Sequence, residues 1–113
     1  MSNAELTKGS LPWELLEAAA PILRVLGHPV RLRIVETLMN QRLSVSALAA
    51  VIGYPQAAVS GHLAQLRGQR LVVCERDGRA CFYRVAHPAV GFIIECLRRH
   101  GSDLERLGQV SVD

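Results

Sequence analysis

Residues 71–85, LVVCERDGRACFYRV, limit the possible folds of this chain more than any other stretch. Two β-prone runs flank Asp77-Gly78, and an Asp-Gly pair between such runs is a strong signal for a β-hairpin. The other patterned segments have apolar residues at helical spacing. The chain is therefore predicted to be mainly α-helical with a single hairpin, in the order four helices, hairpin, helix.

Prolines and glycines divide the helical part of the chain. Residues 11–26 form the first predicted helix, and Pro21 is expected to kink or split it. His28-Pro29 opens the second helix, because proline suits the first helical position. Pro88 opens the last helix, which is expected to run to about residue 107.

A third, short helix is predicted before the segment that matters most for function. Ser44 or Ser46 can cap its start, and Gly53 ends it. Its inward residues are expected to be Leu48, Val51 and Ile52.

The fourth helix, YPQAAVSGHLAQLR (residues 54–67), has two unlike faces. Val59, Leu63 and Leu66 form an apolar face suited to a core. The opposite side carries small, amide and hydroxyl side chains and no acidic residue. A coat of Lys and Glu would be usual on a solvated face, so this helix is expected to press against a partner.

Positive charge is concentrated in the middle of the chain. The net charge is +3, but residues 41–85 hold six arginines against Glu75 and Asp77, a net of +4. Of the 13 basic residues only Lys8 is a lysine, and the guanidinium group matches phosphate geometry better than ammonium does. A basic face that simply meets solvent is, on charge alone, an equally good interpretation.

The length of 113 residues suits one domain with one core. We expect a flexible arm over residues 1–10, whose MSNA start resembles a cloning scar, a folded domain over 11–107 and a tail over 108–113. No apolar run approaches the ~18 residues of a membrane span, so a cytoplasmic location is expected. Three cysteines without a CxxC pair argue for a reducing compartment.

Two helices joined by a tight turn, followed by a basic hairpin, define a winged helix-turn-helix. In this fold the second helix of the pair enters the DNA major groove, where amides and hydroxyls contact bases and phosphates. Small residues let the helix axis approach the groove floor, and arginines at the hairpin tip reach the backbone or minor groove. The predicted DNA contacts are Gln56, Ala57, Ser60, Gly61, His62, Gln65, Arg67, Arg76 and Arg79.

His62 lies on the shoulder of the fourth helix and has two interpretations. Its imidazole can donate to a phosphate, which we favour, or it can pack against the second helix. Arg31 is expected to be a structural residue near the start of the second helix rather than a DNA contact.

Three motifs together resemble the ArsR/SmtB family of bacterial repressors. They are LGHPVRLRIVETL (26–38), LSVSALAAVIGYPQAAVSGHLAQLR (43–67) and LVVCERDGRACFYRV (71–85). The resemblance implies a homodimer held by the first and last helices, with Trp13 and Leu16 in the dimer core. It also implies a palindromic double-stranded operator, repression and release by an effector. Two departures are Gly61, where many relatives carry a larger polar residue, and Pro55, where a hydroxyl cap is common.

The resemblance also implies two places for a metal ion. The arsenic-sensing members carry Cys-Val-Cys where this chain has Ser44-Val45-Ser46, so a thiolate site is excluded there. The zinc-sensing pattern on the last helix aligns with His87, Ala89, His100 and Asp103. Three of these can hold zinc or a similar divalent ion at the dimer interface. We favour the alternative, in which His87 caps the helix and His100 is solvated.

Two cysteines fall on opposite strands of the hairpin. With a two-residue Asp-Gly turn, Arg76 faces Arg79 and Cys74 faces Cys81. Opposed Cα atoms lie about 4.5–5.5 Å apart, which permits a reducible disulfide and hence a redox site. We favour the simpler interpretation that both are small residues filling the wing. Cys96 in the last helix is assigned to the core or the dimer interface.

Two other functional classes remain open. The first is a winged-helix module that binds protein and not DNA. The second is an enzyme, for which no catalytic constellation is present: Ser60 and His62 stand two apart on a helix, so their side chains diverge. A DNA-binding transcriptional regulator is the function the residues favour, and no catalytic activity is expected.

Overall fold

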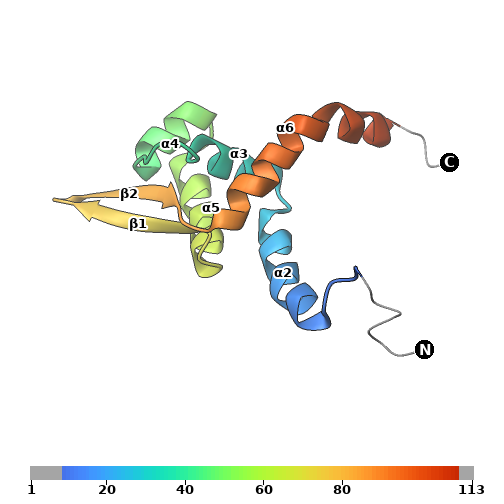
Figure 1. The fold of residues 1–113 in the computed structure, drawn as a ribbon. Helices are drawn as coiled ribbons and strands as arrows, with labels where there is room; N and C mark the ends of the chain where they lie inside the picture. Colours follow the sequence, from blue (N-terminus) through green and yellow to red (C-terminus); the bar gives the residue numbers. More distant parts are fainter. Residues whose placement is uncertain (1–8, 110–113) are drawn as a thin grey trace.

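The computed structural model describes residues 9–109, and its elements follow the predicted order of helices, hairpin and helix (Figure 1). Most of the predicted arm (1–10) and of the predicted tail (108–113) lies outside the described residues. The helices and strands are α2 (Trp13–Leu26), α3 (Pro29–Thr37), α4 (Val45–Ile52), α5 (Gln56–Gly68), β1 (Val72–Asp77), β2 (Ala80–Val85) and α6 (Pro88–Gln109).

The hydrophobic core lies where α3, α4, α5, the base of the hairpin and the first half of α6 meet. The three apolar residues predicted to face inward from α5 are all buried, as the helical spacing requires. The fully buried side chains are Ile34, Val35, Leu38, Leu48, Val59, Leu63, Leu66, Leu71, Val72 and Val90. Every one is apolar, so burial of hydrophobic surface holds the helix-turn-helix to the hairpin.

The predicted helix ends are confirmed by their capping contacts. The amide of Val30 donates to His28 Nδ1 over 3.1 Å at the start of α3. Ser44, rather than Ser46, caps α4, where its hydroxyl oxygen accepts from the amide of Ala47 at 3.2 Å. Gly53 ends α4 in the left-handed region with φ of 76°, which glycine adopts without a Cβ clash.

Pro21 does not split α2, which runs through it as one helix, and whether it kinks the helix stays a prediction. Because this helix is largely exposed, the carbonyl that loses its helical donor there can be hydrated. The predicted inward face of α4 is wrong in one residue. Val51 is 64% exposed and does not face the core. The true inward stripe of α4 is i, i+3, i+4, i+7, and it consists of Val45, Leu48, Ala49 and Ile52.

The hairpin register differs from the prediction by one residue. Asp77 pairs with Ala80, so the two-residue loop is Gly78-Arg79 and not Asp77-Gly78. Gly78 has φ of 67°, and a glycine with positive φ at the first loop position is typical of the type II′ hairpin turn. Consequently Arg76 faces Cys81, and Arg79 lies in the loop itself.

A backbone bridge fastens the hairpin to the helical body. Leu43 and Tyr83 exchange both backbone hydrogen bonds, at 3.1 Å and 2.8 Å, so the segment before α4 forms a one-residue third strand. The hairpin therefore has a fixed base, and its tip extends away from the body (Figure 1).

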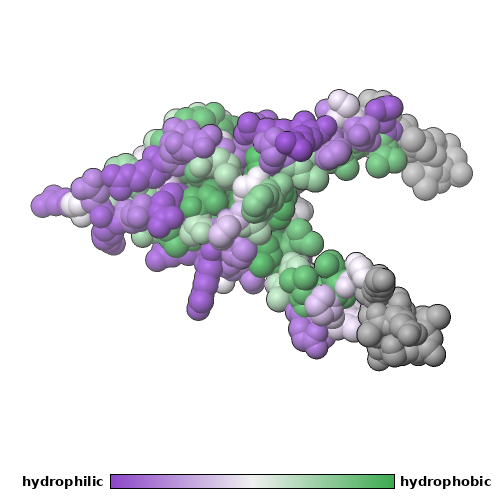
Figure 2. Space-filling view, in the orientation of Figure 1, coloured by the Kyte–Doolittle hydropathy of each residue, from purple (hydrophilic) through white to green (hydrophobic). Residues whose placement is uncertain are grey.

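α2 and α6 leave the body on the side opposite the hairpin tip (Figure 1). The described part of the chain extends over 60 × 35 × 22 Å. Hydrophobic residues are exposed on both helices. Figure 2 shows them on α2 and on the side of α6 toward α2, whereas the opposite side of α6 and the hairpin are mostly hydrophilic. The large ones are Trp13, Leu15, Leu16 and Leu23 of α2 and Phe92, Leu104 and Leu107 of α6.

Candidate nucleic-acid interface

The outward face of α5 is open to solvent along its whole length. Gln56, Ala57, Ser60, Gly61, Gln65 and Arg67 are all exposed, as predicted for a helix that meets an external partner. A Cβ placed at Gly61 would touch nothing within 4 Å, so the packing of this protein does not require glycine there. Because glycine has no side chain, the outward surface of α5 lies near the helix axis at this position. This suits close approach of a flat or grooved surface.

Pro55 precedes α5 as its N-cap and provides no side-chain cap. The departure from the family at Pro55 therefore leaves α5 without a side-chain cap. The unsatisfied amides of the first turn point out of the helix start, next to exposed Gln56. An anion such as a phosphate can satisfy amides in this position.

The C-terminal end of α5 holds an arginine in an unusual conformation. Arg70 has φ of 58°, the left-handed region that favours glycine. Its amide donates to the Arg67 carbonyl at 2.9 Å, and the Leu71 amide donates to the Leu66 carbonyl at 3.0 Å. These two bonds form a Schellman motif with arginine at the position usually taken by glycine. An exposed, cationic side chain is thus kept at a place where glycine would be more stable.

His62 adopts the packing alternative that we did not favour. Its Nδ1 accepts from Arg31 Nε at 3.1 Å, and its ring lies 4.5 Å from the ring of His28. Burial, followed by the nearby His28 and Arg31, lowers the pKa of His62. This tertiary contact holds the His62 ring, so His62 joins α5 to α3. The position of His62 on its helix does not reveal such a contact. A phosphate contact through its other ring nitrogen stays a prediction.

Arg31 is a structural residue, as predicted. Besides His62, its guanidinium donates to the Val25 carbonyl at 3.1 Å near the end of α2. One arginine thus connects α2, α3 and α5.

Both acidic residues of the hairpin are neutralised by arginine. Asp77 lies 3.4 Å from Arg42, whose guanidinium also lies 4.9 Å from the ring centre of Phe82. Glu75 lies 3.0 Å from Arg84. The sequence count of charges could not show which arginines are taken up by these pairs.

Four arginines of the same region have no carboxylate within 4.0 Å among the residues that the structure describes. All four are exposed, two at the end of α5 and two at the hairpin tip. They are Arg67, Arg70, Arg76 and Arg79. The acid-free face of α5 is therefore flanked by positive charge that no carboxylate of the described residues offsets. Arg70 is the member that the list of predicted DNA contacts lacks, although the sequence places it in the same basic region.

The proposed metal ligands do not meet within one protomer. His87 Nδ1 accepts from the Ala89 amide at 3.1 Å and so caps the start of α6. His100 lies one turn from Asp103, with 3.8 Å between Nδ1 and the carboxylate. Thirteen residues of helix separate the two histidines by roughly 20 Å. No group of three potential ligands occurs within residues 9–109, so a site here needs donors from a second copy and stays a prediction.

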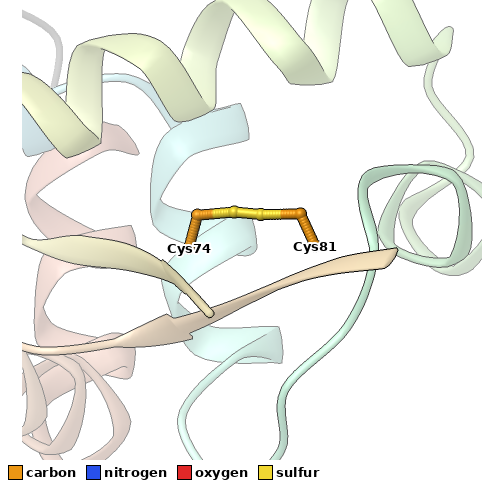
Figure 3. The surroundings of a disulfide bond; sticks show 2 residues. All are labelled: Cys74 and Cys81. Carbon is orange, nitrogen blue, oxygen red and sulfur yellow. A yellow bond between two sulfur atoms is a disulfide. The ribbon is translucent and has the colours of Figure 1, made fainter. Parts of the chain in front are cut away.

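Cys74 and Cys81 are joined by a disulfide, and their Cα atoms lie 5.8 Å apart (Figure 3). The register that suggested the pair is wrong, since Cys74 faces Tyr83 and Cys81 faces Arg76. The two cysteines are instead diagonal neighbours on one face of the hairpin, and side chains at diagonal positions remain within reach. The interpretation of two unlinked small residues is therefore not what the structure shows. Cys96 is exposed on α6 and does not lie in the core of the protomer.

No helix in the described part of the chain is both long and apolar enough to cross a membrane. The helix pair α4–α5 with its glycine-containing turn, and the hairpin fastened beside it, define a winged helix-turn-helix protein.

Comparisons with known proteins agree with this class. A family model described as "Bacterial regulatory protein, arsR family" matches residues 28–73. The nodulation protein NolR of Rhizobium meliloti is 38% identical over 81 residues, which are 72% of this chain and 66% of NolR, just under two thirds of its length. The repressor SmtB of Mycobacterium tuberculosis H37Rv is 37% identical over 93 residues, 81% of this chain and 69% of SmtB. The crystal structure of NolR from Sinorhizobium fredii matches with a TM-score of 0.71 and 32% identity, over 88% of this chain and 92% of NolR.

This chain belongs to the arsR family of bacterial regulatory proteins. It is thus a winged-helix transcriptional regulator, and the resemblance drawn from its three motifs is confirmed.

Proposed function

We propose that this protein is a homodimeric repressor that binds a palindromic operator through α5 and the hairpin, here called the wing, and leaves it when an effector binds. The observation that carries the proposal is the exposed, acid-free face of α5 between four arginines that have no carboxylate partner within residues 9–109. Double-stranded DNA is the partner that such a surface fits, because the affinity of a protein for DNA depends largely on neutralising backbone phosphates.

Within this proposal the α5 residues divide by chemistry. Gln56 and Gln65 read base edges with their amides, Ser60 contacts base or phosphate, and Ala57 meets a thymine methyl group. Gly61 keeps the helix close to the groove floor. Arg76 and Arg79 at the wing tip, with Arg67 and Arg70 at the end of α5, contact the backbone.

The dimer is proposed to form through α2 and α6. Their exposed apolar residues lie on the side of the protein opposite the wing (Figure 2). Exposed apolar patches of this kind mark protein interfaces. Pairing of two copies there leaves both α5 helices free to enter successive major grooves, about 34–36 Å apart. A second copy would also bring a second set of His87, His100 and Asp103 to the interface, which is the arrangement a zinc-like effector needs.

The site contains nothing that favours catalysis, and we propose no reaction for it. A regulator of this kind acts in the cytoplasm, where the operator lies. A module that binds only protein is the alternative. The arginines beside the acid-free helix, which have no carboxylate partner in the described part of the chain, weigh against it.

The test is a fluorescence-anisotropy titration against a fragment of the gene's own promoter and a shuffled fragment of equal length. The expected result is tighter binding to the promoter fragment, with an affinity that falls steeply as salt rises from 50 to 200 mM, on the scale of about 10³-fold or more for six phosphate contacts. Equal affinity for both fragments, or no binding at low salt, would contradict the proposal and favour the protein-binding module.

A further inference from the structure

We propose that Cys74 and Cys81 form a redox-active pair in which disulfide formation fixes the wing in its DNA-binding form, so that the oxidised protein binds the operator more tightly than the reduced protein. This inference rests on the proposed function, because it assigns a regulation to the same surface.

The placement of the pair makes the bridge a clamp on the wing tip. Cys74 is in β1 and Cys81 in β2, and the segment between them is the whole loop with the last ladder pairs. Arg76 and Arg79 both lie inside this closed segment. Any restriction that the bridge imposes therefore acts directly on the two arginines that the wing presents.

Little else in the described structure holds this tip. The backbone bridge from Tyr83 to Leu43 is level with Cys74, which Tyr83 faces, and it is farther from the loop than Cys81. Beyond the bridge, residues 76–80 are all exposed. Their one ion pair to the body, Arg42 with Asp77, is exposed, and such pairs contribute little. A two-stranded hairpin is marginally stable by itself, so the order of the tip depends on the covalent link.

The two sulfur atoms lie on the inner side of the wing. Cys74, Cys81 and Tyr83 share one face of the ladder with Val72, which is buried in the core. Figure 3 places the bridge on the side of the strands toward α5. Both cysteines are half-buried, whereas Cys96 is exposed on α6. The pair is therefore separate from the third thiol, which serves as an internal control.

The chemistry is thiol–disulfide exchange with a low-molecular-weight disulfide as the oxidant. The thiolate of one cysteine attacks the small disulfide and releases one thiolate, leaving a mixed disulfide on the protein. The second cysteine, already within bridging distance, attacks the mixed disulfide and releases the second small thiolate. The protein loses two electrons and two protons, and one small disulfide becomes two small thiols.

The expected consequence is a change in affinity through preorganisation. A reduced wing must be ordered when it meets DNA, and ordering a single exposed side chain opposes binding by an amount equivalent to about twofold to tenfold in affinity. We therefore expect oxidation to tighten operator binding by about threefold to tenfold, with no change in which operator is preferred.

The experiment compares the full-length protein equilibrated with glutathione disulfide and with dithiothreitol, and mass spectrometry checks the loss of two hydrogens. Anisotropy titrations with the promoter fragment are run on three proteins in both redox states. They are the wild type, the Cys74→Ser/Cys81→Ser double variant and the matched Cys96→Ser variant. The expected result is tighter binding by the oxidised wild type and by oxidised Cys96→Ser. The double variant is expected to bind like the reduced wild type in both buffers.

Equal affinities in the two redox states, weaker binding on oxidation, or a redox response that survives in the double variant would overturn the inference. A measurement without DNA separates this failure from failure of the proposed function. Amide hydrogen exchange over residues 74–81 should slow on oxidation in the wild type and not in the double variant. If exchange is unchanged the clamp is refuted, whereas absence of DNA binding in both states with slowed exchange refutes the proposed function alone.

Discussion

The two ends of this protein expose opposite kinds of surface. The end formed by α5 and the wing carries amides, hydroxyls, glycine and arginines without carboxylate partners among the described residues. The end formed by α2 and α6 exposes large apolar side chains, among them Trp13 at 75% and Phe92 at 78%. Neither surface suits water alone, since one concentrates like charge and the other leaves apolar area hydrated.

The contrast teaches which partner each end requires. A polyanion would neutralise the positive charge at the first end. Another apolar surface would bury the apolar area at the second end away from water. Arg31 lies between them, because it contacts the end of α2 and also His62 of α5. We therefore propose that an effector acting on the α2–α6 seam reaches α5 through this contact.

The largest effect is expected from placing a charge in the apolar end. Phe92→Glu should raise the dimer dissociation constant by about 30-fold to 1,000-fold, the range of an interface residue worth about 2–4 kcal/mol. Sedimentation velocity over a concentration series measures it. Because Phe92 is not part of the core, circular dichroism should show an unchanged fold.

Val51→Glu is the matched control for that variant. Val51 is also an exposed apolar residue, but it lies on α4 and not on α2 or α6. Its variant should dimerise like the wild type. If both variants dissociate equally, or neither does, the end formed by α2 and α6 is not the dimer interface. The partner assigned to that end would then be wrong.

The next effect concerns base reading by α5. Gln56→Ala should lose about 1–3 kcal/mol of binding at one operator position and relax the preference there. Competition with operators mutated one base pair at a time measures the preference. Gln69→Ala, at the half-buried end of α5, should leave the preference unchanged. An unaltered preference in Gln56→Ala would remove this residue from the reading set.

A smaller, sequence-independent effect is expected from the wing. Arg79→Ala should weaken binding to every fragment and reduce the slope of log affinity against log salt by about 1, because one phosphate contact is lost. Arg33→Ala removes an arginine that is paired with Glu36 on α3 and should leave the slope unchanged. Equal slopes for all three proteins would mean that the wing does not touch the duplex.

Gly61→Ala tests whether the missing side chain at residue 61 lets α5 approach DNA closely. The stability and the DNA affinity of the variant are expected to change in opposite directions. The variant should be more stable by about 1 kcal/mol in urea unfolding, since alanine favours helix and open space surrounds the site. It should nevertheless bind DNA less tightly, because the added methyl group holds the helix away from the groove. Gly101→Ala in α6 also enters open space and should bring the stability without the loss of affinity. A Gly61→Ala variant that binds as well as the wild type would show that α5 does not approach the bases closely at residue 61.

The fold was predictable where the signals are local. The inward face of α5, the cap at Ser44 and the stop at Gly53 each depend on residues within about one helical turn. The hairpin was predictable in position but not in register, because Asp77-Gly78 and Gly78-Arg79 both place the glycine in a two-residue loop. A shift of one residue changed a facing cysteine pair into a diagonal one.

The site was predictable in composition and not in pairing. The exposed α5 residues follow from helical periodicity, which is why they lie where the sequence places them. The engagement of His62 by Arg31, 31 positions away, and of Asp77 by Arg42 depends on tertiary contacts. The strained backbone of Arg70 also has no local sequence signal, since glycine and not arginine is usual there.

The smallest effect tests the contact that links the two ends. The pKa of His62 lies below its ordinary value of about 6.5 because of burial, His28 and Arg31. As the pH falls below that ordinary value, the unfolded chain takes up the proton before the folded protein does, so the folded state loses stability. Urea unfolding should therefore show the wild type losing more stability between pH 7.5 and 5.5 than His62→Gln. Glutamine keeps an acceptor for Arg31 but does not titrate. Identical pH dependence in the two proteins would mean that His62 is not held between α3 and α5 in solution, and the two ends would then lack this connection.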